Sequence, residues 1–66
     1  MTTKQMLCSL VGTNKLSVRE IKNGSMKGYT IVIVKDPYTG CDDVQEALRN
    51  ILPPDSKTFV QRFTAA

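Results

Sequence analysis

A run of six residues, 29–34 (Tyr-Thr-Ile-Val-Ile-Val), constrains the fold of this chain more than any other feature. β-Branched and aromatic residues of this kind favour a strand. Successive side chains of a strand point to opposite faces of the sheet, so a sheet with one face in water alternates apolar with polar residues. This run does not alternate in that way. A strand at 29–34 therefore needs cover on both faces, from the chain itself or from a partner.

The length of the chain limits how much cover it can provide for itself. Its 66 residues make one small domain, residues 1–66, near the lower size limit for independent folding. Chains of this size commonly supplement a small core with a disulfide, a metal or a second subunit. We expect the supplement here to be another protein or a second copy of the chain, because the sequence disfavours the other two.

Residues that bind metals or form disulfides are scarce. The chain has no histidine and only two cysteines, Cys8 and Cys41, which are too few ligands for a structural zinc site. We therefore expect no metal and no cofactor. The first residues contain no apolar stretch of the kind that marks a secretory signal, so we expect a reducing, cytoplasmic environment in which both thiols are free. No apolar run approaches the ~20 residues of a membrane span, so we expect no membrane partner.

Hydrophobic patterning and turn residues divide the chain into five elements. We predict a helix at about 42–52 and strands at 5–11, 15–22, 29–35 and 57–64. A first helical turn is the alternative for 5–11, since Met and Leu are good helix formers. A break in the alternation of the second strand predicts a bulge near Glu20. The order β-β-β-α-β indicates a small α+β domain with a three-stranded antiparallel meander, one helix and a C-terminal strand that returns parallel to one of the others.

The predicted helix carries a single apolar stripe. The residues at the spacing i, i+3, i+4 and i+7 are Val44, Ala47, Leu48 and Ile51. Leu48 lies in the middle of the stripe, and we expect it to be the most buried. Asp42 and Gln45 resemble a capping box, and the Pro-Pro pair after Leu52 ends the helix. On the last strand, we assign Phe59 and Phe63 to the core.

The residues required by common catalytic mechanisms are missing or poorly placed. Without histidine, no Ser-His or Cys-His pair can form within one chain. Asp42 and Asp43 are neighbours, so on a helix their side chains point about 100° apart. They suit the positive end of the helix dipole better than acid–base catalysis. Cys41 lies near the same helix end without a base beside it. We therefore expect no catalytic residues and no enzymatic activity.

Basic residues are concentrated in the first half of the chain. Residues 1–35 carry six Lys or Arg and one Glu, a net charge of +5, whereas residues 36–66 carry three Lys or Arg and five Asp or Glu, a net charge of −2. A basic half favours an anionic partner, most commonly nucleic acid. The candidate contacts lie on the second strand and its hairpin: Lys15, Arg19, Lys22 and Lys27. The alternative is that these residues only protect exposed strands from edge pairing.

The strand at 29–34 points to a protein interface instead. A single helix covers either Tyr29, Ile31 and Ile33 or the alternate set of the same strand. We take the alternate set as the interface: Thr30, Val32 and Val34. Val32 and Ile33 are neighbours and point to opposite faces, so one should lie under the helix and the other in an interface, most simply a two-fold one. Within one chain, the alternative is that residues 1–11 form a second helix over the spare face.

These observations favour a small non-catalytic binding protein that acts through protein–protein contact or self-association, as an inhibitor or regulator does. Nucleic-acid binding through the basic second strand and its hairpin is the alternative function. The salt dependence of binding to a duplex separates the two, because phosphate contacts release counterions and contacts between apolar side chains do not.

Overall fold

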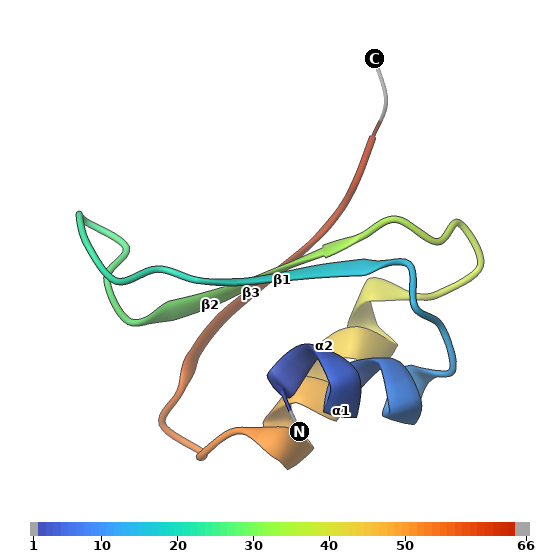
Figure 1. Cartoon of the computed structure of the whole chain (residues 1–66), viewed down its shortest axis with the longest axis horizontal. Helices are drawn as coiled ribbons and strands as arrows, with labels where there is room; N and C mark the ends of the chain where they lie inside the picture. Colours follow the sequence, from blue (N-terminus) through green and yellow to red (C-terminus); the bar gives the residue numbers. More distant parts are fainter. Residues whose placement is uncertain (1, 65–66) are drawn as a thin grey trace.

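The computed structural model describes residues 2–64, which form two helices and three strands (Figure 1). Their order is α1 (Thr3–Val11), β1 (Leu16–Glu20), β2 (Tyr29–Val34), α2 (Cys41–Ile51) and β3 (Lys57–Arg62). The strands form one sheet in the order β1-β2-β3, and both helices pack on the same side of it (Figure 1). The α+β class is confirmed. The predicted order β-β-β-α-β, with one helix, is wrong because the first element is a helix.

Residues 5–11, which we predicted as a strand, belong to α1. The segment carries helix signals at both ends. The hydroxyl of Thr2 accepts a hydrogen bond from the N–H of Gln5 (3.2 Å), and the side chain of Gln5 accepts one from the N–H of Thr2 (2.9 Å), which makes a capping box. At the other end, Gly12 adopts the left-handed conformation (φ 77°) that favours glycine. Leu7 is fully buried and anchors this helix to the core.

The sheet combines one antiparallel and one parallel pair of strands. β1 and β2 pair antiparallel, and β3 returns parallel to β2 after the α2 crossover, as predicted. The prediction of a three-stranded antiparallel meander is wrong, because the residues predicted as its first strand form helix α1. A bulge lies near Glu20, as predicted, but its extra residue is on the opposite strand, where Gly28 and Tyr29 both face Ile21. The N–H of Gly28 donates to the carbonyl of Ile21 (2.8 Å), and the N–H of Ile21 donates to the carbonyl of Tyr29 (2.9 Å). Gly28 has φ 93°, the conformation that this type of bulge requires.

The apolar stripe of α2 is buried as predicted. Val44, Ala47 and Leu48 are its buried residues, and Leu48 has no solvent-exposed surface. The capping box predicted at Asp42 is wrong. Gly40 is the N-cap residue, and no side chain of residues 2–64 caps this end. Asp42 lies in the first turn instead, where a negative charge suits the helix dipole.

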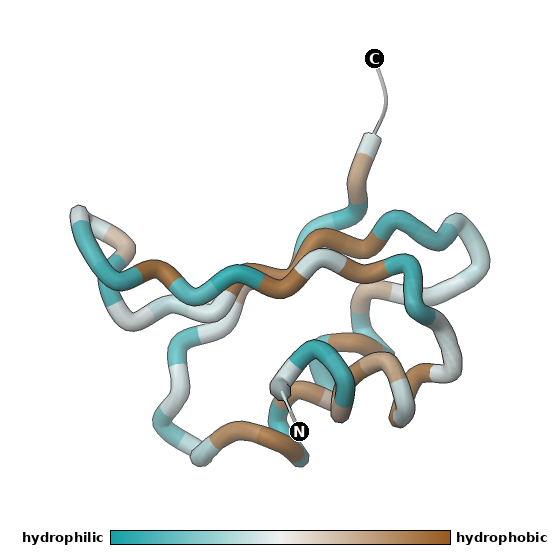
Figure 2. The backbone as a smooth tube through the Cα atoms, in the orientation of Figure 1, coloured by the Kyte–Doolittle hydropathy of each residue, from teal (hydrophilic) through white to brown (hydrophobic). Residues whose placement is uncertain are grey.

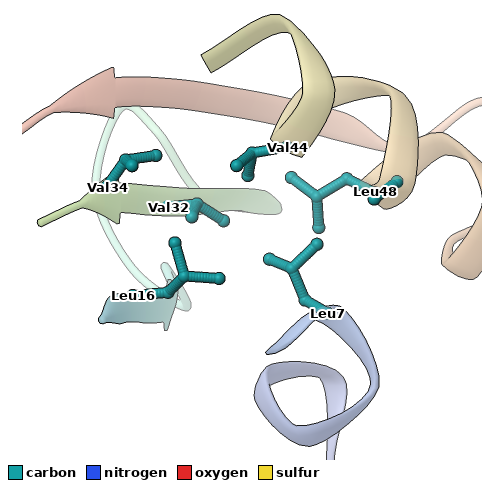
Figure 3. Close-up of a cluster of buried hydrophobic side chains, with 7 residues drawn as sticks. Leu7, Leu16, Val32, Val34, Val44 and Leu48 are labelled. Carbon is teal, nitrogen blue, oxygen red and sulfur yellow. The ribbon is translucent and has the colours of Figure 1, made fainter. Parts of the chain in front are cut away.

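One small apolar core holds both helices on the sheet. Leu7 of α1 and Leu48 of α2 point toward each other beside the side chains of β1 and β2 (Figure 3). The buried apolar residues of the core are Leu7, Leu16, Val32, Val34, Val44, Ala47 and Leu48. The middle of the sheet and parts of the helices are hydrophobic, whereas the hairpin and the loops are mostly hydrophilic (Figure 2). The core therefore occupies only the space between the helices and one face of the sheet.

Arg62, at the end of β3, holds the loop between β2 and α2. Its guanidinium donates to the carbonyl oxygens of Asp36 (2.8 Å) and Thr39 (2.6 Å). The Asp36 carboxylate accepts a hydrogen bond from the N–H of Tyr38 (2.8 Å), and this hydrogen bond lowers the pKa of the carboxyl below its ordinary value. The guanidinium of Arg62 is thus occupied by hydrogen bonds to backbone carbonyls of its own chain.

We expect Leu48→Ala to lower the free energy of unfolding by about 2–5 kcal/mol, because it removes buried surface and leaves a cavity. A loss of this size is comparable with the whole stability of a small domain. Urea unfolding followed by circular dichroism measures it. Glu46→Ala, at an exposed position of the same helix, is the control. A Leu48→Ala chain as stable as the control would contradict the packing of α2 on the sheet.

The hydrogen bond to Asp36 predicts a pH dependence. A carboxyl whose pKa is lower in the folded than in the unfolded chain stabilises the fold above the unfolded pKa. That contribution is lost as the pH falls through the folded pKa. We expect an NMR titration of Asp36 to give a midpoint below 3.8 in the folded chain, and a higher midpoint in the urea-unfolded chain. Equal midpoints would show that the Tyr38 N–H does not hold the carboxylate.

Candidate binding surface

The face of the sheet opposite the helices is uncovered by the described part of the chain (Figure 1). The register pairs odd-numbered with odd-numbered residues across β2, so the odd positions of all three strands share one face. The even positions of β2 are the buried ones. We call the odd-numbered side the open face. Its strand residues are Ser17, Arg19, Tyr29, Ile31, Ile33, Lys57, Phe59 and Gln61.

The open face continues one row beyond the strands. The N–H of Lys35 donates to the carbonyl of Lys15 (2.9 Å), and the N–H of Phe63 donates to the carbonyl of Val34 (2.8 Å). Both ladders therefore extend past their last paired residues, and the alternation places Lys15, Lys35 and Phe63 on the open face. Phe59 and Phe63 are 46% and 56% exposed. The prediction that they belong to the core is wrong.

The predicted interface residues lie on the other face. Val32 and Val34 have no exposed surface and Thr30 is 9% exposed, so all three are inside the chain's own core. The prediction chose the wrong face of β2. The neighbouring strands explain the outcome, because β1 and β3 place the apolar residues Leu16, Val18 and Val60 on the even side and only Phe59 among their paired positions on the odd side. The helices cover the side with more apolar neighbours.

The N-terminal helix does not supply the missing cover. The alternative of a helix at 1–11 over the spare face is wrong in its placement, because α1 lies beside α2 on the same side of the sheet (Figure 1). The prediction that one of Val32 and Ile33 lies under a helix is confirmed, and the buried residue is Val32. Ile33 is on the open face and only half-buried. That Ile33 lies in an interface stays a prediction.

The charges of the open face have one sign. Among the described residues, its charged side chains are Lys15, Arg19, Lys35 and Lys57, and none of its positions is Asp or Glu. Lys15 is directly opposite Lys35 across the β1–β2 pair, and like charges in this arrangement repel each other. The ammonium of Lys57 lies 5.8 Å from the centroid of the Tyr29 ring, a cation–π contact. An anion bound on this face would relieve the repulsion.

The four basic residues that we predicted as nucleic-acid contacts do not all lie on one surface. Lys15 and Arg19 share the open face but lie four positions apart on one strand, about 13 Å. Lys22 and Lys27 are exposed in the hairpin between β1 and β2. The structure adds cations and rings that sequence reasoning missed: Tyr29, Lys35, Lys57, Phe59 and Phe63. The alternation of Lys, Phe, Gln and Phe at every second position from 57 to 63 was the available signal.

Other parts of the described chain offer less chemistry. Cys8 and Cys41 are free and pack partly buried against the core. Residues 2–64 hold no group of three or more His, Cys, Asp or Glu side chains arranged for a metal. None of the helices described is long and apolar enough to cross a membrane. A shallow groove between the helices is lined by apolar and acidic side chains, among them Leu10, Tyr38 and Glu46.

The chain matches no protein-family model, and comparisons with curated proteins and with solved structures found no match.

Val32 is fully buried and its neighbour Ile33 is on the open face, so lysine substitutions at these two positions should have opposite effects on folding. We expect Val32→Lys to unfold the chain, because it places a charge in a fully buried position. Ile33→Lys should leave the chain folded, since the new ammonium points into water from the open face. Circular dichroism and thermal melting distinguish the two variants. Unfolding by both substitutions would mean that the open face is covered.

Proposed function

We propose that the chain is a small non-catalytic binding protein, that the open face is its contact surface and that its partner is anionic. The single observation that carries this proposal is the composition of that face. It combines partly exposed apolar and aromatic side chains with Lys and Arg, and none of its described positions is Asp or Glu. A regulator or an inhibitor acts in this way, through contact alone.

The apolar part of the open face supports a contact role. Ile31 and Ile33 occupy its middle and are flanked by Phe59 on β3. Both helices of the described chain pack on the other face, so these side chains gain burial only from a partner. Grouped exposed apolar side chains with a polar rim are typical of interaction sites. Here Arg19 and Lys57 form part of that rim.

The charges disfavour a second copy as the partner on this face. A two-fold contact between open faces would bring the four cations of one copy against the same four of the other, and like charges in an interface are costly. A contact between the open face and the acidic first turn of α2, with Asp42 and Asp43, would be head-to-tail and would give a ring or an open filament rather than a two-fold dimer. An anionic partner of another kind satisfies the charges directly.

We therefore expect the chain to be a monomer. This holds even at low ionic strength, where attraction between the basic open face and the acidic first turn of α2 in another copy would be strongest. Sedimentation velocity at two protein concentrations, with and without added salt, measures this. A single species at both concentrations is the expected result. A dimer that persists in Ile33→Lys would place the contact elsewhere, and a dimer lost in that variant would make a second copy the partner.

Heparin chromatography tests the open face as an anion-binding surface. We expect Arg19→Ser/Lys57→Ser to elute at clearly lower salt than the wild type. The matched control is Lys4→Ser/Arg49→Ser, which removes two exposed cations from the helices. Each pair lowers the net charge from +3 by two, to +1. The control should elute close to the wild type, because a local field and not net charge governs a specific contact.

Equal elution of the two double variants would contradict the proposal, since it would mean that heparin responds to net charge alone. Circular dichroism of both variants should match the wild type, because all four positions are exposed.

A further inference from the structure

We propose that the anionic partner of the open face is a single-stranded nucleic acid, which runs along β3 and stacks its bases on Phe59 and Phe63. This inference rests on the proposed function and names the class of partner. Two features carry it: the exposed rings on the open face and the cations placed beside them.

Strand β3 presents a regular series of side chains on the open face. Lys57, Phe59, Gln61 and Phe63 follow one another at every second residue, so the series is cation, ring, amide, ring. The two rings lie four residues apart, about 13 Å along the strand. Stacking on aromatic rings is how sheets and grooves bind single strands, and it tolerates any base. The amide of Gln61, between the rings, can both donate and accept hydrogen bonds at a base edge.

Cations accompany each end of this series. Phe63 continues the row of Lys35 and Lys15, as the backbone hydrogen bonds at that end of the sheet show. At the other end, Lys57 lies opposite Tyr29. A strand with bases on the rings would thus have phosphate partners at both ends of β3. Phosphates between Lys15 and Lys35 would also remove the repulsion between these two ammonium groups.

A duplex fits this surface less well. The base faces of a duplex are stacked on one another, so exposed rings cannot reach them without unstacking. Cations alone would bind duplex and single strand through phosphates, and the rings would then contribute nothing. The partial exposure of Phe59 and Phe63 therefore favours the single strand.

The test measures binding of a fluorescent dT12 oligonucleotide by anisotropy. We expect Phe59→Leu and Phe63→Leu each to weaken binding by about 5-fold or more, the lower end of the effect of losing one stacked base. Tyr38→Leu is the matched control, because it removes a ring that is 96% exposed beside the helices, and it should leave the affinity unchanged. Thermal melting checks that the three variants are folded.

Two further measurements separate this inference from the proposed function. Phe59→Leu and Phe63→Leu should elute from heparin at higher salt than Arg19→Ser/Lys57→Ser, because all four cations of the open face remain. A 12-base-pair duplex should bind more weakly than dT12 at the same salt. Leucine variants that bind dT12 as well as wild type, or a duplex that binds equally well, would overturn the single-strand assignment.

The remaining outcome is an acidic protein as partner. If Arg19→Ser/Lys57→Ser elutes early from heparin but the wild type does not bind dT12 at low salt, the single-strand inference is wrong and the anion-binding face stands. If the heparin elution also fails to depend on Arg19 and Lys57, both the inference and the proposed function are wrong.

Discussion

The structure depends on burial of one side of β2. Val32 and Val34 have no exposed surface, and they belong to one apolar cluster with Leu7 of α1 and with Val44 and Leu48 of α2 (Figure 3). This cluster is the only large apolar core within residues 2–64 of the 66-residue chain. The hairpin, the parallel return of β3 and the placement of both helices all bring side chains to it. Losing any one of these elements would expose the same small set of residues.

Concentrating both helices on one face leaves the sheet asymmetric. The uncovered face keeps apolar side chains in its middle, since β2 carries isoleucine at odd positions 31 and 33 as well as valine at even positions 32 and 34. Cations at its rim, including Lys15 and Lys35, keep the face hydrated and oppose pairing with an identical face. Under the proposed function, the same cations attract the anionic partner.

Local signals predicted β1, β2, α2 and β3 and misassigned only the first element, α1. The stripe of α2 and the parallel return of β3 were predicted because both follow from spacing and chain direction. The segment 5–11 was misassigned because a short apolar run fits a strand or a helix equally well by periodicity. Its capping residues, Thr2 with Gln5 and Gly12, distinguish the two, and they are local. Lys15 and Arg19 of the open face were found from charge, whereas Phe59 and Phe63 were assigned to the core because they are apolar.

The sequence by itself determined that residues 29–34 form a strand with two apolar faces, that Val32 and Ile33 point in opposite directions, and that one amphipathic helix follows. These are properties of neighbouring residues and of strand and helix periods. Only the tertiary structure decided which face is buried. That choice depends on the residues that β1 and β3 place beside β2 in register, such as Leu16 against Val34 and Phe59 against Ile31. Because register joins residues far apart in the chain, the summed burial of a whole face, and not any local pattern, determines where the helices pack.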